Sequence, residues 1–138
     1  MYKRQAYDGD AQRIGLQAAE SLGVDPSRVL KTLMTLVDGK PVCVVLASDR
    51  EASMKKLAAA VGGKSAQMMK PADAERITGY HVGGISPLGQ KRAVLTLIDE
   101  AAREHAKVFV NGGQRGLQVE LAPQELARAS GARFASVV

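Results

Sequence analysis

Two glycine-rich segments are the first candidates for a functional site in this sequence. One covers residues 80–91 and the other residues 111–116, and each contains a pair of adjacent glycines. Glycine lets a backbone approach a ligand closely and lets amide groups point into a cavity. Several such amides could bind a phosphate or stabilise a developing oxyanion. The alternative is that these glycines only turn the chain, and residue chemistry alone leaves both interpretations open.

A lysine in an apolar run is the second candidate. Lys31 lies between Val29 and Met34, where a strand would be half-buried. Its side chain either extends to the surface or points into a cleft, where its positive charge could hold a phosphate or a polarised carbonyl. Arg115, in the second glycine-rich segment, is a further candidate for contact with an anion. The alternatives are a solvated strand lysine and a solvated loop arginine.

Familiar catalytic motifs do not fit the first glycine-rich segment. Residues 84–91 are not a P-loop, because Gln90 separates the glycine from the lysine and Pro87 removes an amide donor. Ser86 lacks both the downstream glycine of a nucleophile elbow and an evident His–Asp pair, so it remains a hydrogen-bond donor rather than a nucleophile.

Side chains that bind metals or form disulfides are too few for such sites. The chain has one cysteine and two histidines, so zinc-ligand spacings are absent. Cys43 lies among valines and is expected in the core, and His81 has no partner at a useful spacing. Asp8 and Asp10 are expected as turn and cap residues. We therefore expect no structural metal site.

Composition bounds the class of protein. The chain has 138 residues, 46% of them hydrophobic and 4% aromatic, with a formal net charge of +5. This is enough aliphatic material for one core and too little aromatic material for a platform that stacks single-stranded bases. A single cysteine fits the reducing cytoplasm, and no apolar run is long enough for a membrane span. The mild positive charge permits a polyanionic partner without requiring one.

Periodicity and turn signals predict an α+β fold. We expect one domain over residues 1–138, with a mixed, mostly antiparallel, curved β-sheet flanked by short helices. The expected strands cover residues 2–7, 29–37, 42–47, 65–69, 93–98, 107–110, 117–121 and 133–138. The expected helices cover residues 11–22, a single turn after 25, a segment from 48 to 61, and residues 71–78, 99–105 and 123–130.

Three local signals underlie these boundaries. Asp38-Gly39 between two apolar runs is typical of a tight hairpin turn. Ser48 and Glu51 have the spacing of a capping box, which places a helix start there. Asp10 is expected to cap the first helix.

The glycine-rich segments and the lysine together resemble a known family. The matching stretches are Val29-Leu30-Lys31-Thr32-Leu33, then TGYHVGGISPLGQK over residues 78–91, and then GGQRGL over residues 112–117 followed by ELAP over residues 120–123. In order and over nearly the whole chain, they are similar to the YbaK/EbsC family of free-standing aminoacyl-tRNA deacylases. This family is related to the editing domain of bacterial prolyl-tRNA synthetases, and the branch that this chain resembles acts on Cys-tRNA(Pro).

The resemblance implies a function and a set of site residues. It implies hydrolysis of the ester between a misattached amino acid and the 3′ end of tRNA, without a metal or organic cofactor. Prolyl-tRNA synthetase is an implied partner, whereas DNA and membranes are not. Lys31 matches the lysine associated with activity. The implied substrate-binding residues are Gly83, Gly84, Ile85, Ser86 and Pro87 in the first segment and Asn111, Gly112, Gly113 and Arg115 in the second.

Two positions depart from the family pattern. Asn111 replaces a serine that usually precedes the second glycine pair, and Gly9 replaces a histidine near the start. The change at Asn111 leaves the preferred amino acid open. The alternatives are therefore an editor of another ester, such as Ala-tRNA(Pro), and a non-catalytic module that binds the tRNA end or a synthetase.

Overall fold

The structure is a computed structural model that describes residues 7–138, with side chains from residue 13 onward. The helices in this range are α1 (Tyr7–Leu22), α2 (Met54–Ala60), α3 (Pro71–Thr78) and α4 (Pro123–Ser130), with 3₁₀ turns η1 (Pro26–Arg28) and η2 (Glu100–Glu104). The strands are β1 (Leu30–Val37), β2 (Lys40–Ala47), β3 (Ala66–Met68), β4 (Leu95–Asp99), β5 (Val108–Asn111), β6 (Gln118–Leu121) and β7 (Arg133–Ala135). None of these helices is long and apolar enough to cross a membrane.

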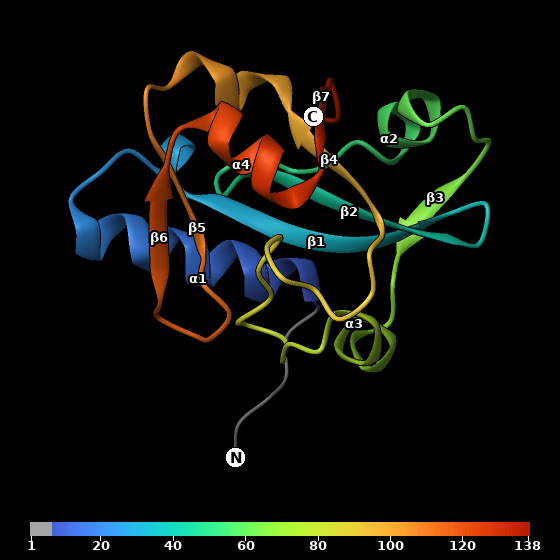
Figure 1. The fold of residues 1–138 in the computed structure, drawn as a ribbon, viewed down its shortest axis with the longest axis horizontal. Helices are drawn as coiled ribbons and strands as arrows, with labels where there is room; N and C mark the ends of the chain where they lie inside the picture. Colours follow the sequence, from blue (N-terminus) through green and yellow to red (C-terminus); the bar gives the residue numbers. More distant parts are fainter. Residues whose placement is uncertain (1–6) are drawn as a thin grey trace.

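The strands form one mixed sheet and one separate ribbon (Figure 1). In the five-stranded sheet the order is β3-β1-β2-β4-β7. β1 is antiparallel to β2 and β3, whereas β2–β4 and β4–β7 are parallel pairs. β5 and β6 form an antiparallel ribbon, which a single bridge between Val29 and Phe109 joins to the start of β1. The predicted α+β class with a mixed sheet is confirmed.

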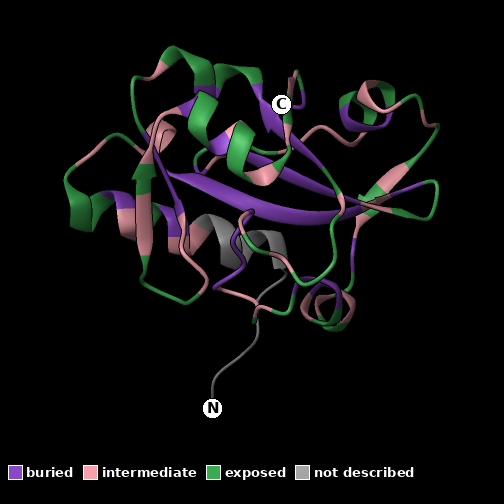
Figure 2. Cartoon of the chain, viewed as in Figure 1, coloured by how far each residue is buried: buried purple, intermediate pink, exposed green. Residues whose placement is uncertain are grey.

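The β1–β2 hairpin forms the centre of the sheet, as predicted. The register pairs Val37 with Lys40, so Asp38 and Gly39 make the two-residue turn. Both turn residues have positive φ, 50° at Asp38 and 81° at Gly39, which matches the right-handed twist of the flanking strands. Figure 2 shows this hairpin as the most continuously buried part of the chain.

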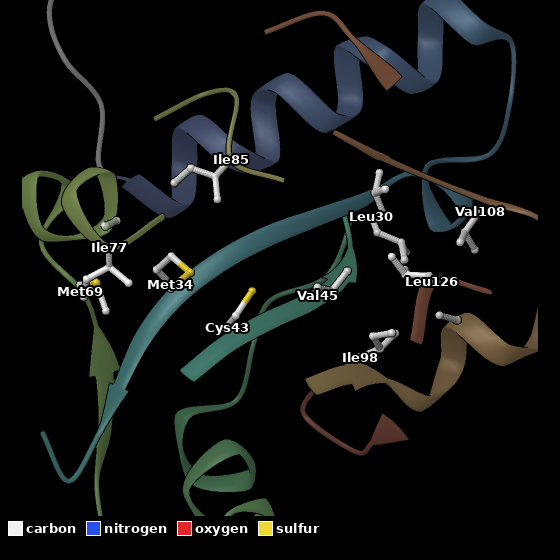
Figure 3. Packing of buried hydrophobic residues seen from close by; sticks show 13 residues of the cluster. Leu30, Met34, Cys43, Val45, Met69, Ile77, Ile85, Ile98, Val108 and Leu126 are labelled. Carbon is white, nitrogen blue, oxygen red and sulfur yellow. The ribbon is translucent and has the colours of Figure 1, made fainter. Parts of the chain in front are cut away.

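Alternation along the hairpin divides the core between the two faces of the sheet. Leu30, Met34, Cys43 and Val45 belong to one cluster, which also includes Ile85 of the first glycine-rich segment and Leu126 of α4 (Figure 3). The other cluster includes the hairpin side chains of the opposite face together with Leu57 of α2, Leu97 of β4 and Val137. The face of β1 that carries Leu30 and Met34 therefore packs against the first glycine-rich segment through Ile85.

The expected start of α2 is wrong. Ser48 N–H donates to the carbonyl of Val29 across 2.9 Å, and the Ser48 hydroxyl donates to the same oxygen, so this residue continues the strand pairing instead of starting a helix. The helix begins at Met54, and its cap is Ser53, whose hydroxyl accepts from Lys56 N–H at 3.1 Å.

Other boundaries also differ from the prediction. α1 already includes Tyr7 and Asp10, so Asp10 is not its cap, and residues 2–6 of the first expected strand lie outside the described range. The last strand ends at Ala135 rather than at residue 138, because Val137 N–H turns to the Asp99 carboxylate at 3.2 Å.

Candidate functional site

The two glycine-rich segments touch each other at Gly84. A Cβ atom added to Gly84 would lie 2.8 Å from Cα of Gln114 and 3.0 Å from the backbone nitrogen of Arg115. These contacts involve main-chain atoms, which cannot move aside as a flexible side chain does. Glycine at this position therefore permits a backbone-to-backbone approach of two segments about 30 residues apart in the sequence.

Asn111 bridges the same two segments through its side chain. Its Nδ2 donates to the carbonyl of Gly83 across 3.5 Å, and its Oδ1 accepts from the N–H of Gly113 at 2.7 Å. Asn111 is the last residue of β5 and pairs with Gln118, the first residue of β6. The end of the ribbon is therefore the element that places the second segment beside the first.

Tyr80 supports the junction, although sequence reasoning did not identify it. Its hydroxyl donates to the carbonyl of Leu88, which ties the two ends of the first segment together. A Cβ atom added to Gly113 would lie 3.0 Å from the ring, at Cε1. An aromatic side chain ahead of a glycine pair was the available signal, because a ring next to glycine can pack on exposed backbone.

A small cavity of about 40 Å³ lies where these segments meet α1 and β1. It is lined by Ile14, Gly15, Leu30, Lys31, Thr32, Gly83, Ile85, Asn111 and Gln118. Four of the predicted site residues are among them: Lys31, Gly83, Ile85 and Asn111. The structure thus brings the candidate lysine and both glycine-rich segments to one cavity.

Lys31 is buried in the sheet, with only 4% of its surface exposed. It lies on β1 and pairs with Leu46 of β2, so its backbone is held in the middle of the hairpin. Lysines are rarely this buried. Of the two interpretations of Lys31 from the sequence, the structure favours the cleft over the solvated strand position.

The remaining predicted residues lie around the cavity rather than in its lining. Ser86 is buried, and its hydroxyl accepts from Leu88 N–H at 3.1 Å, so it shapes the turn that includes the buried Pro87. Gly112 packs under Leu117, since a Cβ atom there would lie 2.8 Å from Leu117 Cγ. Gly84 and Gly113 make the contacts described above.

Arg115 stands beside Gly83 at the edge of a wider groove. A Cβ atom added to Gly83, whose φ is 97°, would lie 3.3 Å from Arg115 Nε. The groove has a volume of about 520 Å³ and shares Ile14 and Gln118 with the cavity. Its wall includes Leu22 and Leu117, each 43% exposed. The small cavity therefore adjoins a larger apolar surface that carries one cation at its rim.

Five residues of the cavity lining were not predicted as site residues: Ile14, Gly15, Leu30, Thr32 and Gln118. Gly15 has a clear local signal, because a glycine inside an amphipathic helix usually reflects close packing. A Cβ atom added to Gly15 would lie 2.0 Å from Ser48 Oγ, so only glycine lets α1 lie this close to the sheet. Ile14 and Gln118 have no such signal in the sequence.

The other titratable candidates lie apart from this cavity. Burial raises the pKa of the Cys43 thiol to about 12, so the side chain is an uncharged core residue, as expected from its valine neighbours. His81 is almost fully exposed, with Nδ1 at 3.5 Å from a Glu75 carboxylate oxygen. Within the described residues no cluster of three or more potential ligands could hold a metal ion.

Comparison with known proteins adds independent information. The family model "Aminoacyl-tRNA editing domain" matches residues 11–129. EbsC of Enterococcus faecalis, named there as a candidate Cys-tRNA(Pro)/Cys-tRNA(Cys) deacylase, is 39% identical over 120 residues, which cover 86% of this chain and 73% of that protein. A proline–tRNA ligase of Limosilactobacillus fermentum is 34% identical over 89 residues, or 61% of this chain and 16% of the ligase.

Solved structures show the same fold. The crystal structure of the hypothetical protein APE2540 superposes with a TM-score of 0.82 at 29% identity, over 89% of this chain and 82% of that one. The residues that match the family model, 11–129, include β1 and both glycine-rich segments. They also include every residue that lines the cavity.

Proposed function

The chain belongs to the aminoacyl-tRNA editing domain family, and we propose that it is a free-standing deacylase that hydrolyses the ester of mischarged tRNA, with Cys-tRNA(Pro) as its substrate. The observation that carries this proposal is the cavity at which Lys31, Gly83, Ile85 and Asn111 meet. The proposal assigns the editing domain to residues 1–138. Editing serves a synthetase whose own pocket cannot strongly reject an amino acid of similar size.

The size of the cavity favours a small aminoacyl group. One water molecule needs about 10–15 Å³, so about 40 Å³ accommodates roughly three groups of that size. The two heavy atoms of a cysteine side chain fit this space, and so does the methyl group of alanine. The apolar walls formed by Ile14, Leu30 and Ile85 suit such side chains. Larger aliphatic and aromatic side chains would not enter without rearrangement of the glycine-rich segments.

The adjoining groove suits the terminal nucleoside of the tRNA. It has more than ten times the volume of the cavity, and its exposed Leu22 and Leu117 offer apolar surface to a base. Arg115 at the rim offers a guanidinium to a backbone phosphate. The net charge of +5 adds long-range attraction to RNA.

The chemistry that we propose relies on positioning and on electrostatic stabilisation. Lys31 holds the substrate end, and backbone amides of the 83–87 segment stabilise negative charge on the ester carbonyl oxygen. As the family resemblance implies, the nucleophile is the substrate's own thiol. Its sulfur bonds to the carbonyl carbon, the bond from that carbon to the ribose oxygen breaks, and the thiol proton passes to this ribose oxygen, which leaves as a hydroxyl group. Water then opens the resulting thiolactone to free cysteine.

Two parts of the proposal concern the cellular setting. Similarity to a segment of proline–tRNA ligase supports prolyl-tRNA synthetase as a partner that supplies tRNA selectivity. A role in editing during translation places the protein in the cytoplasm. Neither DNA nor a membrane has a place in this function.

The experiment that tests the proposal is a panel of charged tRNAs. Wild-type protein is incubated with Cys-tRNA(Pro), Ala-tRNA(Pro), Ser-tRNA(Pro) and Pro-tRNA(Pro), and ester loss is compared with the spontaneous rate of each. We expect fast hydrolysis of the cysteinyl ester and little of the others. Faster hydrolysis of the alanyl ester would reassign the substrate, and binding without hydrolysis of any ester would favour the non-catalytic module.

A further inference from the structure

Gln90 joins the first glycine-rich segment to the central hairpin of the sheet. Its Nε2 donates to the carbonyl of Ser86 at 3.0 Å, and the same nitrogen lies 3.6 Å from Cys43 Sγ and 3.8 Å from Met34 Sδ. Met34 of β1 and Cys43 of β2 are paired residues in the hairpin, and both are fully buried. The half-buried Gln90 amide therefore lies against the hairpin while it holds the backbone of Ser86.

The chemistry of this side chain fixes the direction in which its amide faces. The amide nitrogen only donates hydrogen bonds, whereas the amide oxygen only accepts them. Turning the amide over would bring the acceptor oxygens of Gln90 and Ser86 against each other. Thiol and thioether sulfurs are weak acceptors, so the bond to Ser86 is the strongest of the three contacts that the nitrogen makes. A polar group beside an apolar core costs free energy unless it is hydrogen-bonded, and here the bond that satisfies it belongs to the glycine-rich segment.

Other side-chain hydrogen bonds connect the same segment to different places. The Ser86 hydroxyl accepts from Leu88 N–H at 3.1 Å, which ties the segment to itself. Oε2 of Glu75 accepts from Val82 N–H at 2.8 Å, which ties the segment to α3. The bond from Gln90 adds a link to β1 and β2. The position of the segment over the hairpin therefore depends on this side chain.

The carbonyl that Gln90 holds adjoins the part of the segment that lines the cavity. Ile85 lines the cavity together with Lys31 of β1, and Ser86 follows Ile85 directly in the chain. Ile85 also packs in the core, but apolar contact is non-directional and does not orient a peptide group. A hydrogen bond to the carbonyl of Ser86 does orient it. The placement of the nearby backbone amides relative to Lys31 therefore depends on Gln90.

We propose that Gln90 is a positioning residue for ester hydrolysis, which holds the amides of residues 83–87 in their working place relative to Lys31. This inference rests on the proposed function and adds a residue to its machinery. Gln90 is not among the described residues that line the cavity, so it acts through the backbone of Ser86 and not by contact with the substrate. A misplacement of about 1 Å in such machinery can cost about 100-fold in rate.

The test replaces Gln90 by side chains that still pack against the two sulfurs but donate no hydrogen bond. Gln90→Met has nearly the same length, and Gln90→Leu has a different shape, so a loss that both share follows from the missing donor. Gln124→Met, at an exposed position on α4, is the matched control. Values of kcat and KM for Cys-tRNA(Pro) are measured below the melting temperature of each variant. Amide hydrogen exchange of the folded protein is followed without substrate.

We expect kcat to fall by about 10- to 100-fold in both Gln90 variants, because the amides lose their fixed place. KM should stay within about twofold, since Gln90 does not touch the substrate. Hydrogen exchange should become several-fold faster over residues 82–88 and stay unchanged in β1 and β2. A role limited to the stability of the whole protein would instead speed exchange in the hairpin too and leave kcat of the folded protein unchanged. Gln124→Met should match the wild type in every measurement.

Different results would overturn the inference and the proposed function. Wild-type kcat in a folded Gln90 variant would remove the positioning role and leave the deacylase intact. A change in KM alone, or equally faster exchange in the segment and the hairpin, would also remove that role. Absence of hydrolysis of any ester by the wild type would remove the proposed function and the positioning role together. Thermal unfolding shows whether each variant is folded, and if one of the two is not, the other carries the comparison.

Discussion

The side-chain amide of Asn111 spans the two glycine-rich segments, donating to the carbonyl of Gly83 and accepting from the N–H of Gly113. The two bonds differ in length, 3.5 Å to Gly83 and 2.7 Å to Gly113. The shorter bond shapes the second segment, and the longer one sets its distance from the first. Asn111 therefore couples the geometry of one cavity wall to that of the other.

Replacing Asn111 by Ala should loosen this wall. We expect a loss of about 1 kcal/mol in the free energy of unfolding, the usual effect of one net hydrogen bond. We also expect faster hydrolysis of esters with larger side chains, because the shorter residue widens the cavity. Asn111→Ser should restore most of the stability, since a hydroxyl can still accept from Gly113 N–H. Denaturant unfolding and the charged-tRNA panel measure both effects, and unchanged substrate preference in Asn111→Ala would argue against a role in selectivity.

Gly84→Ala should damage the junction itself. The added methyl group would meet Gln114 Cα at 2.8 Å, and overpacking of this kind typically costs about 1–3 kcal/mol. Activity should fall further than stability, because the two segments would be pushed apart. Gly116→Ala is the comparison for backbone strain without a steric contact, since its Cβ meets nothing within 4 Å whereas its φ of 86° strains an alanine. Equal activity in the two variants, assayed below their melting temperatures, would contradict the contact.

Much of this junction was predictable, and particular residues show where prediction ends. Asp38-Gly39 determined the hairpin because a two-residue turn is encoded locally. Ser48 and Glu51 had the spacing of a helix cap, yet the bond from Ser48 to Val29 joins residues 19 apart, and local spacing does not report it. The family resemblance pointed to Lys31 and the glycines. Thr32 and Gln118 have no local signal as cavity residues, because only the fold brings β1 and β6 to the same cavity.

The buried thiol predicts how stability depends on pH. Burial raises the pKa of Cys43 from 9.0 to about 12, so between these values the folded protein holds a proton that the unfolded chain has lost. Stability from this group is complete below pH 9 and falls as the pH rises toward 12. Unfolding free energies measured from pH 8 to 11 should therefore fall more steeply for the wild type than for Cys43→Ala. Parallel slopes would contradict the assignment.

The same burial predicts that Cys43 is unreactive, and the proposed mechanism predicts that it is unnecessary for catalysis. A neutral thiol is a poor nucleophile, so a thiol reagent should label the native protein at pH 8 far more slowly than the unfolded chain. Cys43→Ala should hydrolyse Cys-tRNA(Pro) at a rate close to that of the wild type, since the proposed nucleophile belongs to the substrate. Loss of activity in folded Cys43→Ala would require a different account of the nucleophile.

Arg115 should contribute to binding more than to chemistry. Arg115→Ala would remove the proposed phosphate contact beside the groove, so we expect KM to rise while kcat stays within about twofold. The slope of log KM against log salt should become shallower by about one. Arg128→Ala, on α4, removes the same charge at an exposed position and is the control. An equal change of the salt slope in both variants would indicate only a general effect of net charge.

The measurement that tests the central claim most directly is single-turnover hydrolysis of Cys-tRNA(Pro) by Lys31→Ala and Lys31→Met, beside the wild type and the surface variant Lys55→Ala. Circular dichroism and thermal unfolding establish that each variant is folded. We predict a fall of about 100-fold or more in both Lys31 variants, the usual effect of removing a preorganised electrostatic contact, and no change in Lys55→Ala. Hydrolysis within twofold of the wild type by a folded Lys31 variant would contradict the claim that this lysine and the two glycine-rich segments form the active site.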